Sequence, residues 1–246
     1  MSAAFFVFAT SVCALVAAGI IRFFPKRFAL PAAGILCAWF AFAAFCGLSG
    51  ILANPALRPP GIVYVFLPTF ALIAIMSRSR LGAEIAASVP VPLLVGLESM
   101  RIVVELFLDR LWHAGLLPKM MTFHGANFDI LIGLSAPLVA VAYATRRLNA
   151  RWVFAWNVAG LAMLANIIVR NVLASPAVHV YRTEVRSAVI GTFPYSLLPA
   201  FIVPLALIAH VVAMRALATS IRHGDSTTST LRPAPGGSQT GSGRTA

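Results

Sequence analysis

Four ionisable residues follow one another at helical spacing in a segment that is otherwise apolar: Glu98, Arg101, Glu105 and Asp109. At 100° per residue, all four lie within about 80° of one another on one face of a helix. The spacing predicts that Arg101 pairs with Glu98 at i−3 and with Glu105 at i+4. Carboxylates beside an arginine can bind protons, cations or the polar groups of a small solute.

Two neighbouring apolar segments carry polar residues that we expect at the same end of the molecule. His124, Asn127 and Asp129 stand at the start of one, while Asn166, Arg170 and Asn171 lie in the last part of the other. Asn127 and Asp129 are also residues that commonly cap a helix N-terminus, so a capping role and a site role are compatible. The candidate ligand-binding or proton-coupling residues are therefore Glu98, Arg101, Glu105, Asp109, His124, Asn127, Asp129, Asn166, Arg170 and Asn171.

The composition identifies the class of protein. Of the 246 residues, 60% are hydrophobic and only 11% are charged, with 19 Lys and Arg against 7 Asp and Glu. Soluble domains are about a quarter charged, so a soluble enzyme, a disordered chain and a coiled coil are all excluded. A nucleic-acid-binding protein is excluded as well, because the basic residues lie between long apolar runs and not on a polar face. The sequence predicts an integral membrane protein.

Seven apolar segments are long enough to be membrane-spanning helices at roughly 20 residues each. The fold predicted is an all-α membrane protein, a single bundle of seven transmembrane helices over residues 1–218, followed by a disordered cytoplasmic tail over 219–246 that is rich in Ser, Thr, Gly and Pro. The predicted spans are 3–21, 29–52, 61–77, 88–109, 127–145, 152–174 and 194–216.

The basic residues between these spans predict an N-out/C-in orientation. One set of alternate loops, with the residues after the last span, holds Arg22, Lys26, Arg27, Arg78, Arg80, Arg146, Arg147, Arg151, Arg215 and Arg222. The other set holds Arg58, Lys119, Arg182 and Arg186. Cytoplasmic loops carry the excess of Lys and Arg, so the first set is expected inside. The charged segment 88–109 could instead lie at the interface as an amphipathic helix, but six spans would place Arg146, Arg147 and Arg151 outside.

The stretch ESMRIVVELFLDRLWHAGLLPKMMTFHGANFDILIGLSAP over 98–137 resembles a group of uncharacterised bacterial multi-spanning membrane proteins. Their pattern reads R-x-x-x-E, then G-x-x-P, then M-T-F-x-G-x-N-F-D-I. The segments WNVAGLAMLANIIV (156–169) and FPYSLLPAFIVPLALIAH (193–210) are also similar to that group. The resemblance covers about half the chain; it implies a multi-pass protein of a bacterial cytoplasmic membrane and transfers no activity. The matching residues are Arg101, Glu105, Gly115, Pro118, Met121, Thr122, Phe123, Gly125, Asn127, Phe128, Asp129 and Ile130.

Several known kinds of site do not fit the sequence. A retinal Schiff base needs a lysine within a helix, and Lys26 and Lys119 lie between spans. A bis-histidine haem needs two facing histidines, and His210 has no partner at its depth. The three cysteines show no metal-binding or disulfide spacing. The histidines His113, His124 and His179 lie near the outer surface, where a metal site with Glu105 or Asp109 is the less favoured reading. No cofactor is expected.

These observations leave three functional hypotheses. The first is a carrier or binding protein for a small solute, with an outer polar pocket that is proton-coupled through Glu105 or Asp109. The second is a membrane-embedded enzyme in which carboxylates and His113 or His124 act on a lipid or quinone. The third is a structural or accessory subunit whose buried ionic network fixes helix register. The expected partners are the lipid bilayer and a small-molecule ligand.

Overall fold

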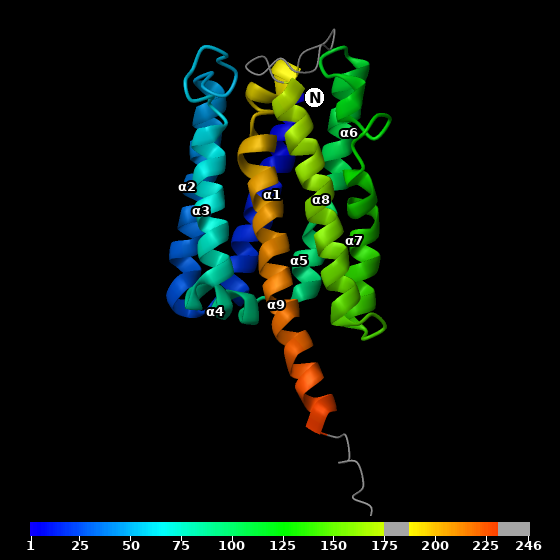
Figure 1. The fold of residues 1–246 in the computed structure, drawn as a ribbon. Coiled ribbons are helices and arrows are strands. Elements are labelled where there is room, and N and C mark those ends of the chain that lie inside the picture. Colours follow the sequence, from blue (N-terminus) through cyan, green and yellow to red (C-terminus); the bar gives the residue numbers. More distant parts are fainter. Residues whose placement is uncertain (175–186, 231–246) are drawn as a thin grey trace, which may run out of the picture.

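The computed structural model describes residues 1–174 and 187–230, and this part of the chain is all-α, as predicted. The elements lie side by side in an elongated bundle (Figure 1). The α-helices are α1 (Ser2–Phe23), α2 (Lys26–Leu48), α3 (Val63–Arg78), α4 (Arg80–Ser88), α5 (Val91–Leu97), α6 (Met100–His113), α7 (Asp129–Ala144), α8 (Ala150–Ala174) and α9 (Val203–Thr230). Shorter elements are the 3₁₀ turns η1 (Lys119–Met121) and η2 (Ser187–Gly191) and the π-helical turn η3 (Leu198–Ile202).

Among the described residues, four helices are long and apolar enough to cross a bilayer: α1, α2, the Ala150–Leu173 part of α8, and Leu198–Arg222. The pair α3 and α4 makes a fifth if it counts as one span bent by 81°. Large apolar side chains point outward all along the bundle; Leu15, Leu30, Leu67, Leu138 and Trp152 are between 66% and 72% exposed. So much outward apolar surface implies contact with lipid. The chain is an integral multi-pass membrane protein.

Two of the predicted spans differ from simple helices. Segment 88–109 is divided into α5 and α6 by a tight turn at Glu98 and Ser99, in which the amides of residues 98, 99, 101 and 102 each bond to the carbonyl three residues earlier. α4 follows directly on the predicted span 61–77, where the sequence suggested only a loop. Ser79 ends α3 in an extended conformation, and its hydroxyl accepts a hydrogen bond from the Gly82 amide, which starts α4.

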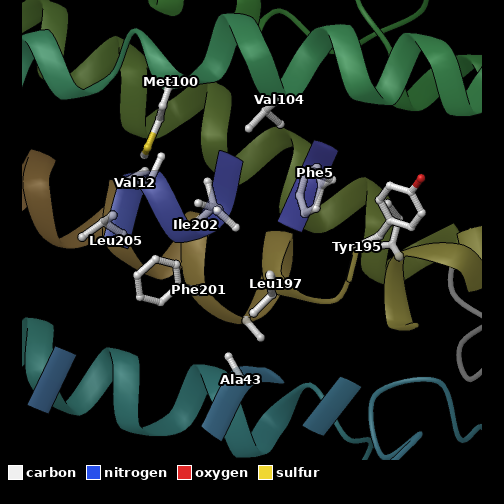
Figure 2. Close-up of a cluster of buried hydrophobic side chains, with 14 of the residues drawn as sticks. Phe5, Val12, Ala43, Met100, Val104, Tyr195, Leu197, Phe201, Ile202 and Leu205 are labelled. Carbon is white, nitrogen blue, oxygen red and sulfur yellow. The ribbon is translucent and has the colours of Figure 1, made fainter. Parts of the chain in front are cut away.

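A large apolar cluster holds one side of the bundle together. Phe5 and Val12 of α1 meet Met100 and Val104 of α6, and Figure 2 shows them together with Phe201, Ile202 and Leu205 around η3 and the start of α9. Met100 and Val104 lie about 140° and 100° around α6 from Glu105. α6 is therefore amphipathic inside the bundle, with an apolar face toward α1 and a polar face elsewhere.

The π-helical turn before α9 is completed by a distant helix. Pro204 has no N–H, so the carbonyl of Ala200 four residues earlier lacks its usual helical donor. The indole Nε1 of Trp39 on α2 donates to that carbonyl at 3.0 Å. Proline is tolerated within membrane helices where a neighbour satisfies the freed carbonyl in this way.

The C-terminal boundary differs from the one expected. α9 runs to Thr230, so residues 219–230, assigned to the tail by their composition, continue the last helix in the structure. A helix that is already formed adds each further residue at little cost, which allows polar residues to extend it. Residues 231–246 lie outside the described part of the chain, as do His179, Arg182 and Arg186.

Candidate functional site

Arg101 is the centre of a buried network that joins several helices. Its Nε donates to Oε2 of Glu98 at 2.9 Å, and its Nη1 donates to Oδ1 of Asp129 and to the carbonyl oxygen of Gly160, each at 3.3 Å. The Arg101 side chain is 4% exposed and that of Glu98 is 1% exposed. Glu98 ends α5, Asp129 begins α7 and Gly160 lies within α8. The guanidinium therefore ties together the broken α5–α6 segment, α7 and α8.

His210 brings α9 into the same network. Its Nε2 lies 2.8 Å from Nη2 of Arg101 and 3.5 Å from Oε2 of Glu98. An arginine only donates, so Nε2 is the acceptor and the imidazole hydrogen is on Nδ1. That hydrogen is donated to Oδ1 of Asn157 at 2.8 Å, and Asn157 Nδ2 donates to the Val153 carbonyl at 2.8 Å. We call Glu98, Arg101, Asp129, Asn157 and His210 the arginine network.

Two glycines make room for the arginine network. A Cβ at residue 160 would lie 2.5 Å from Cε1 of His210, so the imidazole packs directly against the α8 backbone. A Cβ at residue 133 on α7 would lie 2.9 Å from the amide nitrogen of Ile102 and 3.3 Å from Cβ of Arg101. All three distances are shorter than ordinary van der Waals contacts. Glycine is therefore needed at each position for the helices to approach closely enough to reach Arg101.

One turn further along α6, Glu105 makes a separate contact with the segment between α6 and α7. Asn127 Nδ2 donates to Oε1 of Glu105 and, at 3.2 Å, to the carbonyl of Met121. The Oδ1 atom of Asn127 accepts a hydrogen bond from the Asp129 amide, the first of α7, at 3.2 Å. The N-cap position expected for Asn127 is occupied by Phe128 instead. We call residues 114–128 the connector; Asn127 links it to both helices.

Two glycines, Gly115 and Gly125, allow the connector to be compact. Gly115 has a φ of 70°, and the backbone bonds Gly115 N–H to Trp112 O and Leu116 N–H to Leu111 O close α6 in a Schellman motif. At Gly125 a Cβ would lie 2.3 Å from the carbonyl oxygen of Lys119, because the chain folds back on itself there. Gly115 therefore ends α6.

Asp109 does not join the buried groups. It lies near the end of α6, where its carboxylate oxygens are 3.4 Å from Nδ1 of His113 and 3.4 Å from Nε2 of His124. The two histidine side chains are 60% and 47% exposed. We call Asp109, His113 and His124 the rim group. In the described residues, no three histidine, cysteine or acidic side chains are arranged to hold a metal ion.

The polar residues of α8 are divided between two places. Asn166 Nδ2 donates to the carbonyl of Ala126 in the connector at 2.9 Å, and Arg170 Nε donates to Oδ1 of Asn166 at 2.8 Å. These two side chains line an open pocket of about 330 Å³. Asn171 lies on another face of α8 and lines a cavity of about 50 Å³ whose other walls are mainly apolar, Leu108 and Met121 among them.

The structure thus brings together part of the predicted constellation. Arg101 pairs with Glu98 as predicted, but the predicted pair with Glu105 is wrong: the arginine reaches Asp129 and His210 instead. Long side chains on a helix point toward its N-terminus, so Arg101 extends toward the α5–α6 break and away from Glu105. On α8, Arg170 pairs with Asn166, one turn earlier on the same helix.

Sequence reasoning missed His210 and Asn157. His210 was considered only as a haem ligand and set aside because no second histidine faces it; in the structure its partners are Arg101 and Asn157. A polar residue in the middle of an apolar helix is a signal of its own, and the rule that singled out Glu98 applies equally to Asn157 and His210.

Comparison with known proteins identifies a family and no activity. Neither the curated proteins nor the solved structures contain a match to the chain. A family model described as a domain of unknown function (DUF8737) matches residues 59–218, which include the whole arginine network, the connector and the rim group. The match covers more than half of the chain, and the protein therefore belongs to the DUF8737 family of domains of unknown function.

Proposed function

We propose that the chain crosses the cytoplasmic membrane of a bacterium seven times, with its N-terminus outside and α9 ending inside. The positions of the basic junctions support this topology. In Figure 1 the α1–α2 junction, the α3–α4 bend and the α7–α8 loop lie at one end of the bundle. These junctions carry Arg and Lys at residues 22–27, 78–80 and 146–151, and cytoplasmic loops are enriched in these residues.

Reporter fusions test this topology. Fusions after residues 82, 118 and 149 are expected to report inside, outside and inside. The fusion after 118 is the decisive one, because it depends on α5 and α6 acting together as one crossing. An inside signal there would mean that the broken segment does not cross, and the connector would then face the cytoplasm.

We further propose that the buried polar groups form a binding site for a small solute or an ion, used by a carrier or a binding protein. One observation carries this proposal: Oε1 of Glu98 and Oε2 of Glu105 are buried and have no hydrogen-bond partner among the described residues. A buried acceptor without a donor costs about 1–3 kcal/mol, and more when it is charged. A ligand that donates hydrogen bonds or carries positive charge removes that cost.

Native mass spectrometry of the full-length protein, released from mild detergent, tests the proposed site. We expect an adduct on the wild-type chain that is lost from the Glu105→Gln variant, whereas the Glu84→Gln control keeps it. Glu84 pairs with Arg27 at the surface and is not part of the arginine network. A wild-type chain that carries no adduct, and gains none when lipid extract and cell metabolites are added, would contradict the proposal.

A second candidate is a structural role, and the bonding of Arg101 favours it. Four of the five N–H groups of its guanidinium have partners, on Glu98, Asp129, Gly160 and His210. A buried ionic network can fix helix register without any ligand. The two candidate functions apply to different residues. The arginine network fits a structural role that fixes helix positions, whereas Glu105 and the connector fit a binding site whose charge and conformation change.

A further inference from the structure

The carboxyl group of Glu105 is in an unusual electrostatic position. Glu105 is 1% exposed, one of its oxygens accepts from an uncharged amide, and the other has no hydrogen-bond partner in the described part of the chain. The groups that face it are Asp129 on α7, Arg101 on its own helix, Asn127 and the backbone amide of Phe123 in the connector. None of the described salt bridges reaches Glu105.

The charges of this region do not balance when every carboxyl group is ionised. Three buried carboxyl groups, on Glu98, Glu105 and Asp129, stand against the single positive charge of Arg101. His210 contributes no charge, since its Nε2 accepts from Arg101 and a second hydrogen there would meet the guanidinium at 2.8 Å. An isolated ionised carboxylate is very costly away from water, and such a group neutralises instead.

One bound proton reduces this excess negative charge, and the geometry favours one residue for it. Glu98 and Asp129 both contact the guanidinium, so their negative charge is stabilised. Asp109 has two histidines beside it and is 19% exposed, so water and imidazole stabilise it. Glu105 alone among these four has neither a cation nor water at its carboxyl group.

We propose that Glu105 binds a proton and that this proton holds the connector closed over the arginine network. This inference rests on the proposed function and names the ion and the residue that binds it. When Glu105 is protonated, an O–H bond forms on Oε2. The net charge of the four groups Glu98, Arg101, Glu105 and Asp129 then changes from −2 to −1. On release, the proton passes to water at the connector end of the bundle.

Asn127 transmits this change because it is hydrogen-bonded to Glu105, to the connector backbone and to the start of α7. Its amide holds Glu105 and the Met121 carbonyl, and its oxygen holds the first amide of α7. An ionised Glu105 repels Asp129, which is two residues from Asn127 and bonded to it through the backbone. The connector is also held by Asn166 of α8, which donates to the Ala126 carbonyl, and by its buried residues Leu117 and Met121. Ionisation strengthens the hydrogen bond from Asn127, but it also leaves a buried negative charge without a cation. Ionisation therefore favours a state in which the connector opens and water reaches the carboxylate.

Hydrogen–deuterium exchange of the full-length protein in lipid nanodiscs tests the proposal. Peptides that cover the connector are followed as pH rises, and each rate is corrected for intrinsic exchange with a denatured reference. In the wild type, protection of the connector is expected to fall by at least about tenfold, a coupling of ordinary size for two linked sites. The Glu105→Gln variant, which resembles the protonated form, is expected to stay protected throughout. The Glu84→Gln control should behave like the wild type.

Infrared spectra over the same pH range supply a second measurement. A protonated carboxyl C=O band that titrates in the wild type and is missing in Glu105→Gln supports the assignment. A wild-type connector with no pH-dependent protection overturns the proposal, even if Glu105→Gln fails to fold. A titrating band that persists in Glu105→Gln overturns it as well. Neither result depends on the adduct seen by mass spectrometry, so failure here leaves the proposed binding function standing.

Discussion

Two arginine–glutamate pairs in this protein have the same chemistry and opposite surroundings. Arg101 and Glu98 have side chains that are 4% and 1% exposed, at the meeting point of several helices. Arg27 and Glu84 join the start of α2 to α4, with side chains that are 65% and 44% exposed. An exposed pair is screened by water and contributes about 0–1 kcal/mol, whereas removal of one partner of a buried pair costs about 3–5 kcal/mol.

The difference lies in what each arginine leaves behind when it is removed. Without Arg27, Glu84 is hydrated. Without Arg101, Glu98 and Asp129 are buried carboxylates, His210 Nε2 loses its donor and the Gly160 carbonyl loses a bond. The cost of removing a member of a buried ion pair thus depends more on how many buried groups lose a partner than on the attraction within the pair.

The largest expected effect comes from Arg101→Ala. The free energy of unfolding should fall by about 3–5 kcal/mol, because two carboxylates lose their positive partner together. Unfolding of the full-length protein in mild detergent measures it, with Arg27→Ala as the matched control. Similar losses for the two variants would show that the arginine network is hydrated and would remove the distinction between the pairs.

An intermediate effect is expected from Gly160→Ala. The new methyl group would lie 2.5 Å from the His210 ring, and overpacking of this kind costs about 1–3 kcal/mol. The control is Gly19→Ala on α1, where nothing lies within 4 Å of the added carbon. In a chain that also carries His210→Ala, the cost of Gly160→Ala should largely disappear. An undiminished cost in the double variant would locate the clash elsewhere.

The smallest effect is expected from Glu84→Gln. Loss of the exposed pair with Arg27 should change the free energy of unfolding by less than about 1 kcal/mol, and added salt should reduce the difference further. The same unfolding measurement at low and high ionic strength checks this. A loss that is large and independent of salt would mean that α4 is held to α2 as firmly as the network holds the central helices.

The sequence predicts the features that depend on neighbouring residues. The apolar segments become helices, and Asn127 bonds the first amide of α7, because hydropathy and hydrogen bonding at helix ends act over a few residues. The break at Glu98 and Ser99 and the start of α4 at Ser79 also have local causes. The break was missed because a long apolar run was taken as one straight helix, and α4 was missed because the residues between two predicted spans were taken as a loop.

The arginine network could not be predicted in the same way. Arg101 and His210 are 109 residues apart and Asn157 and His210 are 53 apart, so their contact is a result of packing. Spacing along one helix suggested Glu105 as a partner of Arg101, and only the direction of the side chain in the folded bundle decides against it. Polar residues within apolar helices indicate that a network exists; they do not indicate which members meet.

The bond from Trp39 to the Ala200 carbonyl also has a consequence for biosynthesis. The two residues are 161 positions apart, so the second helix leaves the ribosome long before the segment that it completes. Until the last helix is inserted, the Trp39 indole lacks this acceptor. The Ala200 carbonyl receives this hydrogen bond only when α2 is packed beside it. The hydrogen bond between Trp39 and Ala200 therefore forms only after both ends of the chain have been inserted, and it is a late step in the assembly of the bundle.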